Sequence, residues 1–238
     1  LRLAVGGGLT RAALVLLGRP EATYALGGPT PRISWQLVDH RGDHVTHQHF
    51  ELPLVLAIDA LVGRVRIIDV NLLPPREVAP LNLPNYDDWV LREALHNCVA
   101  HQDYAQGGRI LVTESPDTLR FFNYGEFLPG SVDKVLHAAQ PEQRYRNACL
   151  ANAMVELDLM ETINSGVKGM FRKQRERFFP LPDYAIEGPP PSVSVTIYGR
   201  TLDERYVGAL MTHTHLSLDE AVLLDQIQKG RPLAAGQL

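Results

Sequence analysis

The segment Tyr86–Tyr104 constrains the fold of this 238-residue chain more than any other, because it carries two different faces at helical spacing. Asn85 is expected to cap this helix, with Asp87 and Asp88 in its first turn, where the helix dipole favours negative charge. The first face is an apolar stripe formed by Leu91, Ala94, Leu95, Cys98 and Val99. A helix with such a stripe has to bury it against the rest of the chain.

The second face of this helix is polar. Glu93, Asn97 and His101 follow one another at intervals of four residues, so they share one side of the helix. An amide oxygen can be a ligand of Mg²⁺, and a carboxylate can orient or deprotonate a water molecule aimed at a phosphate. The same spacing also fits a solvated face with an ordinary Glu–Asn pair, and the spacing alone leaves both interpretations open.

Strand-like alternation is sparse and lies among several helical patterns. Alternation predicts strands at residues 32–39, 109–114, 119–122 and 192–198. Helical spacing predicts helices at residues 9–17, 50–65, 132–139, 147–159 and 167–178. Ser217 and Glu220 form the pattern of a capping box for a last helix. This order predicts an α+β sandwich with helices on one face of a sheet.

Composition excludes several classes of protein. Apolar residues make up 45% of the chain and charged residues 21%, which is ordinary for a globular protein. The net charge of −4 excludes a uniformly basic nucleic-acid-binding chain, so any contact with DNA needs a local patch. No stretch reaches the roughly 18 apolar residues of a membrane span. Cys98 and Cys149 lie in apolar helical patterns, which predicts reduced, buried thiols in a cytoplasmic protein.

Two glycine-containing segments are further candidates for a ligand site. In residues 123–130, Gly125 and Gly130 allow backbone conformations that bring N–H groups close to a ligand. In residues 164–169, glycines at the start of a helix expose N–H donors of the kind that bind phosphate, and Lys168 and Arg172 add positive charge. A hairpin exit loop and a plain turn between helices are the alternative interpretations.

Taken together, these segments resemble a known family. The runs are LREALHNCVAHQDY (91–104), RILVTESPDTLRFFNYGEFLPGS (109–131) and RNACLANAMVELDLMETINSGVKGMF (146–171). Their order resembles the RecG-like C-terminal ATPase-type domain of bacterial transcriptional regulators. That domain is similar to divergent members of the GHKL superfamily of gyrase, histidine kinase and MutL ATPases. The resemblance covers most of residues 85–199 and implies a GHKL-like sandwich with a mixed sheet.

The resemblance implies a role for each matching residue. Glu93 would be the catalytic residue that orients the hydrolytic water, and Asn97 would ligate Mg²⁺. Asn123 and Gly125 stand where the superfamily has an Asp-x-Gly box that recognises adenine, with Asn in place of Asp. The implied cofactors are ATP and Mg²⁺. The implied nucleotide-binding residues are Asn97, His101, Asn123, Gly125, Ser165, Gly166, Lys168 and Gly169.

The flanking segments resemble other modules of the same regulators. Residues 1–70 are similar to the C-terminal part of a Schlafen/AlbA-type DNA-binding module, on the basis of Leu9–Gly18. The Pro-rich residues 71–84 are expected to be a linker, and residues 85–200 to form the ATPase-like domain. Residues 201–238 resemble a connector and the first helix of a truncated winged helix, on the basis of Leu216–Leu233. The first residue is not Met and the last residues continue a helical pattern, so we expect a fragment of a longer protein.

The functional expectation is a nucleotide-responsive transcriptional regulator that contacts DNA through its flanking modules and forms a homo-oligomer. A nucleotide-free dimerisation scaffold and a Mg²⁺-dependent ATPase are the alternatives. The chain contains no G-x-x-x-x-G-K-[ST] sequence, which excludes a P-loop helicase motor.

Two charged groups of residues have competing interpretations. His40, His44, His47 and His49, with Asp39 and Asp43, could hold Zn²⁺ or be exposed loop residues, and the lack of a nearby Cys favours the latter. His213 and His215 are expected at the surface. The run Lys168, Arg172, Lys173, Arg175 and Arg177 could face phosphates or form a solvated helix face.

Overall fold

A computed structural model describes residues 3–73, 79–138, 144–160 and 166–232. The strands in this part of the chain are β1 (Ala4–Val5), β2 (Gly8–Leu9), β3 (Arg32–Val38), β4 (His44–Phe50), β5 (Asp69–Leu72), β6 (Leu81–Pro84), β7 (Arg109–Glu114), β8 (Thr118–Tyr124), β9 (Asp183–Glu187) and β10 (Ser192–Tyr198). The helices are α1 (Arg11–Leu17), α2 (Thr23–Leu26), α3 (Leu54–Val62), α4 (Asp88–His101), α5 (Val132–His137), α6 (Ala148–Glu156), α7 (Val167–Glu176), α8 (Glu204–Thr212) and α9 (Leu218–Gln228), with a 3₁₀ turn at Pro20–Ala22.

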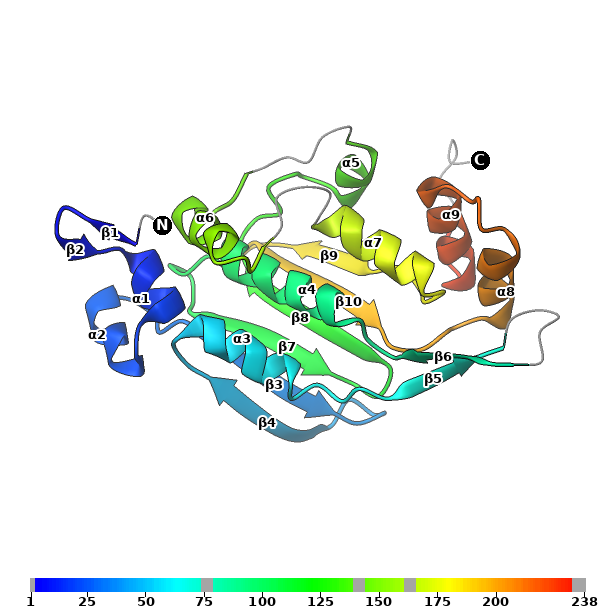
Figure 1. Cartoon of the computed structure of the whole chain (residues 1–238), viewed down its shortest axis with the longest axis horizontal. Coiled ribbons are helices and arrows are strands. Elements are labelled where there is room, and N and C mark those ends of the chain that lie inside the picture. The colour runs from blue at the N-terminus through cyan, green and yellow to red at the C-terminus, as the bar shows by residue number, and fades with distance from the viewer. Residues whose placement is uncertain (1–2, 74–78, 139–143, 161–165, 233–238) are drawn as a thin grey trace.

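A six-stranded sheet in the order β4-β3-β7-β8-β10-β9 forms the centre of the molecule. The β3–β7 pair is parallel and the other neighbouring pairs are antiparallel. Helices α3, α4 and α7 lie side by side over one face of this sheet (Figure 1). The predicted α+β architecture, with helices on one face of a mixed sheet, is therefore confirmed.

The prediction of strands succeeded where one face is buried and the alternation is clear. The predicted strands at 109–114 and 192–198 coincide with β7 and β10, and those at 32–39 and 119–122 overlap β3 and β8. β4 and β9 were not predicted. β4 lies at the edge of the sheet, and Phe50 is its only buried side chain. A strand at the edge of a sheet can form with little alternation of apolar residues, so such a strand is recognised from its backbone hydrogen bonds and not from its sequence pattern.

The Pro-rich segment 71–84 was expected to be an irregular linker, but part of it forms regular structure. Asp69–Leu72 pairs with Leu81–Pro84 in an antiparallel ladder, although residues 74–78 lie outside the described part of the chain. The sheet also crosses the expected linker, since β3, from the first seventy residues, pairs with β7, and β4 pairs with β3. The likeness of the first segment to a separate module and of the last to a winged helix stays a prediction.

Helix α4 is fixed at both ends by side chains. Its N-cap is Asp87, whose carboxylate accepts a hydrogen bond from the Val90 N–H at 3.1 Å. The predicted cap, Asn85, instead accepts from the Ile68 N–H at 3.0 Å and so joins α4 to the preceding hairpin. At the other end, the Asn147 amide donates to the carbonyl of Ala100 at 3.1 Å and to that of Gln102 at 2.8 Å. These contacts set the position of the helix along the sheet.

The predicted apolar stripe of α4 is buried in the main core. Each of its five side chains is at most 3% exposed. They pack with apolar side chains of the sheet, including Leu119 and Phe121 of β8. A polar interaction lies within the same core, where Glu114 of β7 accepts from the Trp35 indole N–H at 2.9 Å and pairs with Arg66 at 2.5 Å. The buried carboxylate thus joins two strands to the segment that follows α3.

Three predictions about single side chains can be compared with the structure. Cys98 is buried as expected, and burial raises the pKa of its thiol to about 12, which makes it unreactive. The prediction for Cys149 is wrong, because this residue is exposed on α6. His213 and His215 are exposed, as expected. No described helix combines the length and the apolar character needed to span a membrane.

A buried ionic cluster attaches α9 to the outer strand β9. The ammonium group of Lys229, whose side chain is 4% exposed, lies 2.6 Å from Asp225 and 3.0 Å from Asp183. Burial raises the pKa of the Asp225 carboxyl. Burial opposes ionisation of Asp183 as well, but hydrogen bonds from Arg231 and the charge of Lys229 hold its pKa below the usual value.

Replacing Lys229 by Met should destabilise the protein by about 3 kcal/mol, because it leaves Asp225 buried without its cation. Urea unfolding at pH 7 measures the loss. Arg205→Ala, which breaks an exposed pair with Asp203, should leave the stability almost unchanged. Adding Asp225→Leu to Lys229→Met should recover part of the loss. Equal effects of Lys229→Met and Arg205→Ala would contradict the ionic anchor.

Candidate functional site

A cavity of about 180 Å³ lies between helices α4 and α7 and strands β8 and β10. Five of the residues that the sequence singled out for nucleotide binding or catalysis line it: Glu93, Asn97, His101, Asn123 and Gly166. They come from three elements that are distant in the sequence. The polar face of α4 is therefore not a solvated helix surface, since it forms one wall of this cavity.

Glu93 and Asn97 form a hydrogen-bonded pair on this wall. The Asn97 side-chain amide donates to the Glu93 carboxylate at 2.9 Å and to the Glu93 carbonyl at 2.8 Å. Glu93 is only 5% exposed. Because the Asn97 side-chain nitrogen donates both of these bonds to Glu93, the Asn97 amide oxygen remains as the group that can ligate a cation or accept a hydrogen bond. A carboxylate beside an amide oxygen is a set of hard oxygen donors of the kind that suits Mg²⁺.

Gly166 brings the start of α7 next to this carboxylate. A Cβ atom on Gly166 would lie 3.7 Å from Glu93 Oε1. The residue has φ 74° and ψ −146°, a conformation close to a region that is nearly reserved for glycine. This backbone lets the first turn of α7 approach α4, with the N–H groups of that turn at the positive end of the helix dipole. Ser165 and Asn164 lie outside the described residues.

Asn123 occupies the sheet side of the cavity, near the end of β8. It is 5% exposed, and its amide nitrogen donates to the Tyr124 carbonyl at 3.0 Å. This bond sets the orientation of the amide and leaves its oxygen as a hydrogen-bond acceptor. The oxygen can therefore accept from an amino group, as the carboxylate of an aspartate would.

His101 forms the end of the polar stripe and lies in contact with Tyr145, with 5.6 Å between ring centroids. Burial, with a smaller contribution from the positive charge of Arg146, lowers the pKa of His101 to about 4. The imidazole is therefore neutral at pH 7 and can both donate and accept a hydrogen bond.

Three predicted ligand residues do not line the cavity. Gly125 has φ 129°, and its N–H donates to the Pro191 carbonyl at 2.8 Å. A Cβ there would meet the His101 carbonyl oxygen at 2.8 Å, so this glycine allows close packing of β8 against α4. Lys168 is partly exposed and Gly169 is buried within α7, and neither is part of the cavity wall.

Several wall residues were missed by the sequence analysis. Lys134 and Arg144 bring positive charge, and Tyr145 and Tyr184 bring aromatic rings. Burial and then the negative charge of Glu93 raise the pKa of both tyrosines, which indicates how near the carboxylate lies. Lys134 follows the Gly loop by four residues, but no spacing rule connects either cation to α4. Only the folded chain brings them together.

The cationic run of α7 does not form one face toward a phosphate. Arg177 is 9% exposed and donates to the Gln174 side chain and the Pro84 carbonyl, so it holds α7 against the end of β6. Arg175 donates to the Leu216 carbonyl at 2.8 Å and contacts the segment before α9. These two arginines are therefore structural.

His40 lies in the turn before β4 and is exposed, as expected. His44, His47 and His49 are also exposed, but they lie on strand β4 and not in a loop, which corrects the expectation for these three. Their rings follow one another with centroids 5.2 and 5.1 Å apart. Within the part of the chain that the structure describes, no three His, Cys, Asp or Glu side chains are arranged to hold a metal ion. The alternative of a Zn²⁺ site is not supported.

The comparisons with known proteins agree with this geometry in part. Residues 107–197 match the family model described as "Putative ATP-dependent DNA helicase recG C-terminal". The match supports an ATPase-like domain of the RecG C-terminal type in this part of the chain, as the resemblance implied. It includes Asn123 and the start of α7, whereas Glu93, Asn97 and His101 precede it.

The fold of this chain is similar to that of a solved structure. The crystal structure of the DIP2311 protein from Corynebacterium diphtheriae aligns with a TM-score of 0.60 and 20% sequence identity, over 82% of this chain. The alignment covers 38% of that protein, so this chain spans well under half of its length. At this identity the likeness concerns the fold alone. A search of curated proteins finds no match.

Gly166→Ala should destabilise the protein by about 1–3 kcal/mol, because alanine at this φ and ψ is strained. The space for a Cβ is sufficient, so the cost comes from the backbone. Gly63→Ala is the control, since Gly63 has φ −65° and its Cβ would be 3.5 Å from the nearest atom. That variant should be neutral or slightly stabilising in urea unfolding. Similar losses in both variants would argue against a special role of the Gly166 backbone.

The stability of the protein should fall as the pH drops from 7 toward 5. His101 and His96 both have a pKa lowered to about 4, in each case mainly by burial, whereas the unfolded chain protonates near pH 6.5. The unfolded state therefore binds more protons in this range, and stability present above pH 6.5 is lost toward pH 4. His101→Gln should reduce the slope by up to about 1.4 kcal/mol per pH unit. Unfolding curves between pH 7 and 5 with unchanged slope would contradict this.

Proposed function

We propose that this chain contains a regulatory nucleotide-binding domain that takes ATP together with Mg²⁺ in the cavity between α4 and α7. The observation that carries the proposal is the shared wall of Glu93, Asn97, Asn123 and Gly166. A carboxylate, two amide oxygens and the N-terminus of a helix are the groups that a metal-bound polyphosphate and a base require. The match of residues 107–197 with an ATPase-like domain supports the same assignment.

Each wall residue has a role in this proposal. Asn97 ligates Mg²⁺ through its amide oxygen, and Glu93 orients or deprotonates a water molecule near the terminal phosphate. The start of α7 donates N–H groups to phosphate oxygens. The Asn123 oxygen accepts a hydrogen bond from the exocyclic amino group of adenine. Since Asn123 keeps this acceptor, the absence of an aspartate at this position does not remove the basis for adenine recognition.

The cavity wall also carries positive charges, which offset the negative charge of its carboxylates. The buried Glu93 carboxylate would by itself repel a triphosphate, and Glu126 on the same wall adds a second negative charge. Lys134 and Arg144 lie on the same wall, and Mg²⁺ adds two further positive charges at the Glu93–Asn97 pair. These charges favour an anionic ligand at a site that the carboxylate by itself would disfavour.

The wider role is that of a nucleotide-responsive transcriptional regulator. Nucleotide binding would change the position of α7 relative to α4 and shift the population of conformations in the flanking segments, which contact DNA. The proposal includes a homo-oligomer in the cytoplasm. The proposal also includes an enzymatic form, in which the domain hydrolyses ATP weakly with the help of Glu93.

A second candidate function is a nucleotide-free dimerisation scaffold. Two features favour it: the cavity, at about 180 Å³, is smaller than the roughly 300–1,000 Å³ of typical ligand pockets, and much of its wall is apolar, including Phe121, Met170 and Val195. A nucleotide would require the wall elements to move apart.

A thermal-shift titration with Mg·ATP distinguishes the two functions. At 100 times the dissociation constant, bound nucleotide should stabilise the protein by about 2.7 kcal/mol, which raises Tm by several degrees. Asn97→Ala should abolish most of the Mg²⁺-dependent shift. Asn82→Ala removes an exposed amide on β6 and should leave the shift unchanged. Asn123→Ala should reduce the preference for ATP over GTP, whereas Asn123→Asp should keep it.

Other outcomes separate binding from catalysis. Phosphate release that is lost in Glu93→Gln while the thermal shift persists would establish hydrolysis. An unchanged Tm at millimolar nucleotide and Mg²⁺ contradicts the nucleotide site and favours the scaffold. Light scattering then determines whether the chain forms an oligomer.

A further inference from the structure

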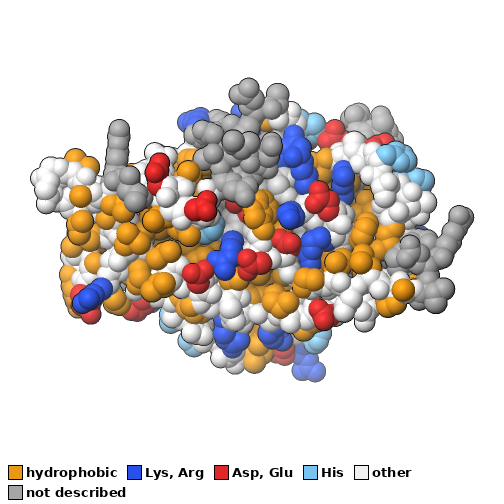
Figure 2. Space-filling view, viewed as in Figure 1, with side chains coloured by type: hydrophobic (Ala, Val, Ile, Leu, Met, Phe, Trp, Pro, Cys, Tyr) orange, Lys and Arg blue, Asp and Glu red, His pale blue; other side chains and the backbone are white. Residues whose placement is uncertain are grey.

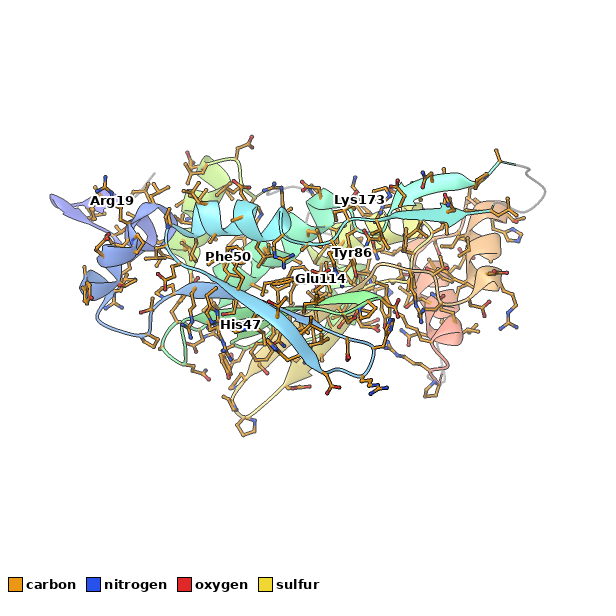
Figure 3. The ribbon with its side chains drawn as sticks, turned by 90° about the horizontal axis from the view of Figure 1, so that it is seen from below. Arg19, His47, Phe50, Tyr86, Glu114 and Lys173 are labelled. Carbon is orange, nitrogen blue, oxygen red and sulfur yellow. The ribbon has the colours of Figure 1, made fainter. Side chains whose placement is uncertain are left out.

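The face of the sheet opposite the helices carries a group of cations. His47 projects from β4 on the side away from α3 (Figure 3). The pairing registers place Arg32, Ser34 and Gln36 of β3 beside Arg109, Leu111 and Thr113 of β7 on this face, and Arg120 and Phe122 of β8 follow them. A shift in the β3–β4 register near Val38 lets His44 join His47 and His49 in a hollow lined also by Ser34, Gln36, Arg109 and Leu111.

These cations are not neutralised by the strands that carry them. Arg32 and Arg109 lie directly opposite each other in the parallel pair, an arrangement of like charges that destabilises a sheet. Arg32, Arg109 and Arg120 form no ion pair within the described part of the chain. The residues of β3, β4, β7 and β8 on this face include no Asp or Glu. Partial desolvation and then the charges of Arg32, His47 and Arg109 lower the pKa of His49, in keeping with an excess of positive charge.

Carboxylates lie at the borders of this surface. Glu51 follows β4 directly, Asp39 and Asp43 lie in the turn between β3 and β4, and Glu187 lies on the outer strand β9. Asp183, also on β9, is engaged by Lys229 and Arg231. The centre of the surface is thus positive in a chain whose net charge is −4. The helical side differs, because acidic and basic side chains are intermixed over it (Figure 2).

Aromatic rings lie beside the cations. Phe122 is opposite Leu111 in the β7–β8 ladder, and Tyr124 is two residues further along the same face. Their ring centroids are 5.1 Å apart, with the planes nearly perpendicular, and both side chains are partly exposed. Rings next to arginines on an open sheet provide stacking surfaces for bases together with contacts for phosphates. An acidic peptide would use the cations but has no need of the rings.

We propose that this surface, formed by Arg32, Arg109, Arg120, the three β4 histidines, Phe122 and Tyr124, binds single-stranded nucleic acid. The arginines contact backbone phosphates, and Phe122 and Tyr124 stack against bases. From Arg32 to Gln36 the surface extends roughly 13 Å along a strand, and its four strands span about 14 Å across, which suits three or four nucleotides. The surface lies on the other side of the sheet from the nucleotide cavity, so the inference does not depend on that cavity.

The test is fluorescence anisotropy of a labelled 12-nucleotide single-stranded DNA with the full 238-residue chain. Arg32→Ala/Arg109→Ala should weaken binding at least tenfold and reduce the slope of log K against log salt by about 1.4. Phe122→Leu, which retains an apolar side chain but removes the ring, should weaken binding about fivefold or more. Arg172→Ala removes an exposed arginine from α7 on the helical side and should bind as the unaltered protein does. Thermal unfolding checks that each variant is folded.

Three results would overturn the proposal. The first is a lack of saturable binding at low salt. The second is an equal loss of affinity in Arg172→Ala and Arg32→Ala/Arg109→Ala, which would indicate unspecific attraction to any cation. The third is equally tight binding of a 12-base-pair duplex with no effect of Phe122→Leu, which would indicate a contact with duplex phosphates alone. Asn97→Ala should leave the oligonucleotide affinity unchanged, which separates this surface from the cavity.

Discussion

The packing of α4 on the sheet is the contact on which the rest of this structure depends. The helix has to bury Leu91, Leu95 and Val99, and the apolar inner face of the sheet is the surface that can receive them. Once this stripe is buried, the polar stripe that runs beside it can point only toward the margin of the contact. Glu93, Asn97 and His101 therefore lie between the helix layer and the sheet, and a cavity remains there because α7 covers the same margin.

The cavity combines groups that would be costly to bury singly. Glu93 is almost fully buried, yet it accepts a hydrogen bond from Asn97 and lies next to the start of α7. A buried carboxylate is tolerated when polar partners and a helix N-terminus surround it. The glycines differ in role: Gly166 allows α7 to begin beside Glu93, whereas Gly125 allows β8 to pass close to the end of α4. Both belong to the site, but only one forms part of its wall.

The two faces of the sheet differ in chemistry because successive residues of a strand point to opposite sides. In β7, Ile110, Val112 and Glu114 face the core, while Arg109, Leu111 and Thr113 face outward. One strand thus supports the packing of α3 and α4 on one side and contributes to a cationic surface on the other. The ionic cluster of Lys229, Asp183 and Asp225 holds α9 against β9, and α8 and α9 lie beside the sheet, beyond α7 (Figure 1).

The sequence by itself determined the helices and strands whose apolar residues repeat along one buried face. The apolar stripe of α4, the strands β7 and β10, and the capping box at Ser217 were all predictable, because periodicity and capping depend on neighbouring residues. Glu93 and Asn97 could be selected for the same reason, since one helical turn joins them. The edge strands β4 and β9 could not, because an edge strand pairs on one side only and these two bury almost no side chains, so their alternation is weak. Three further features could not be predicted either: Lys134 and Arg144 line the cavity, Arg177 donates to the Pro84 carbonyl, and Arg32 lies beside Arg109. These contacts join residues that no local rule relates, so only the tertiary structure decided them.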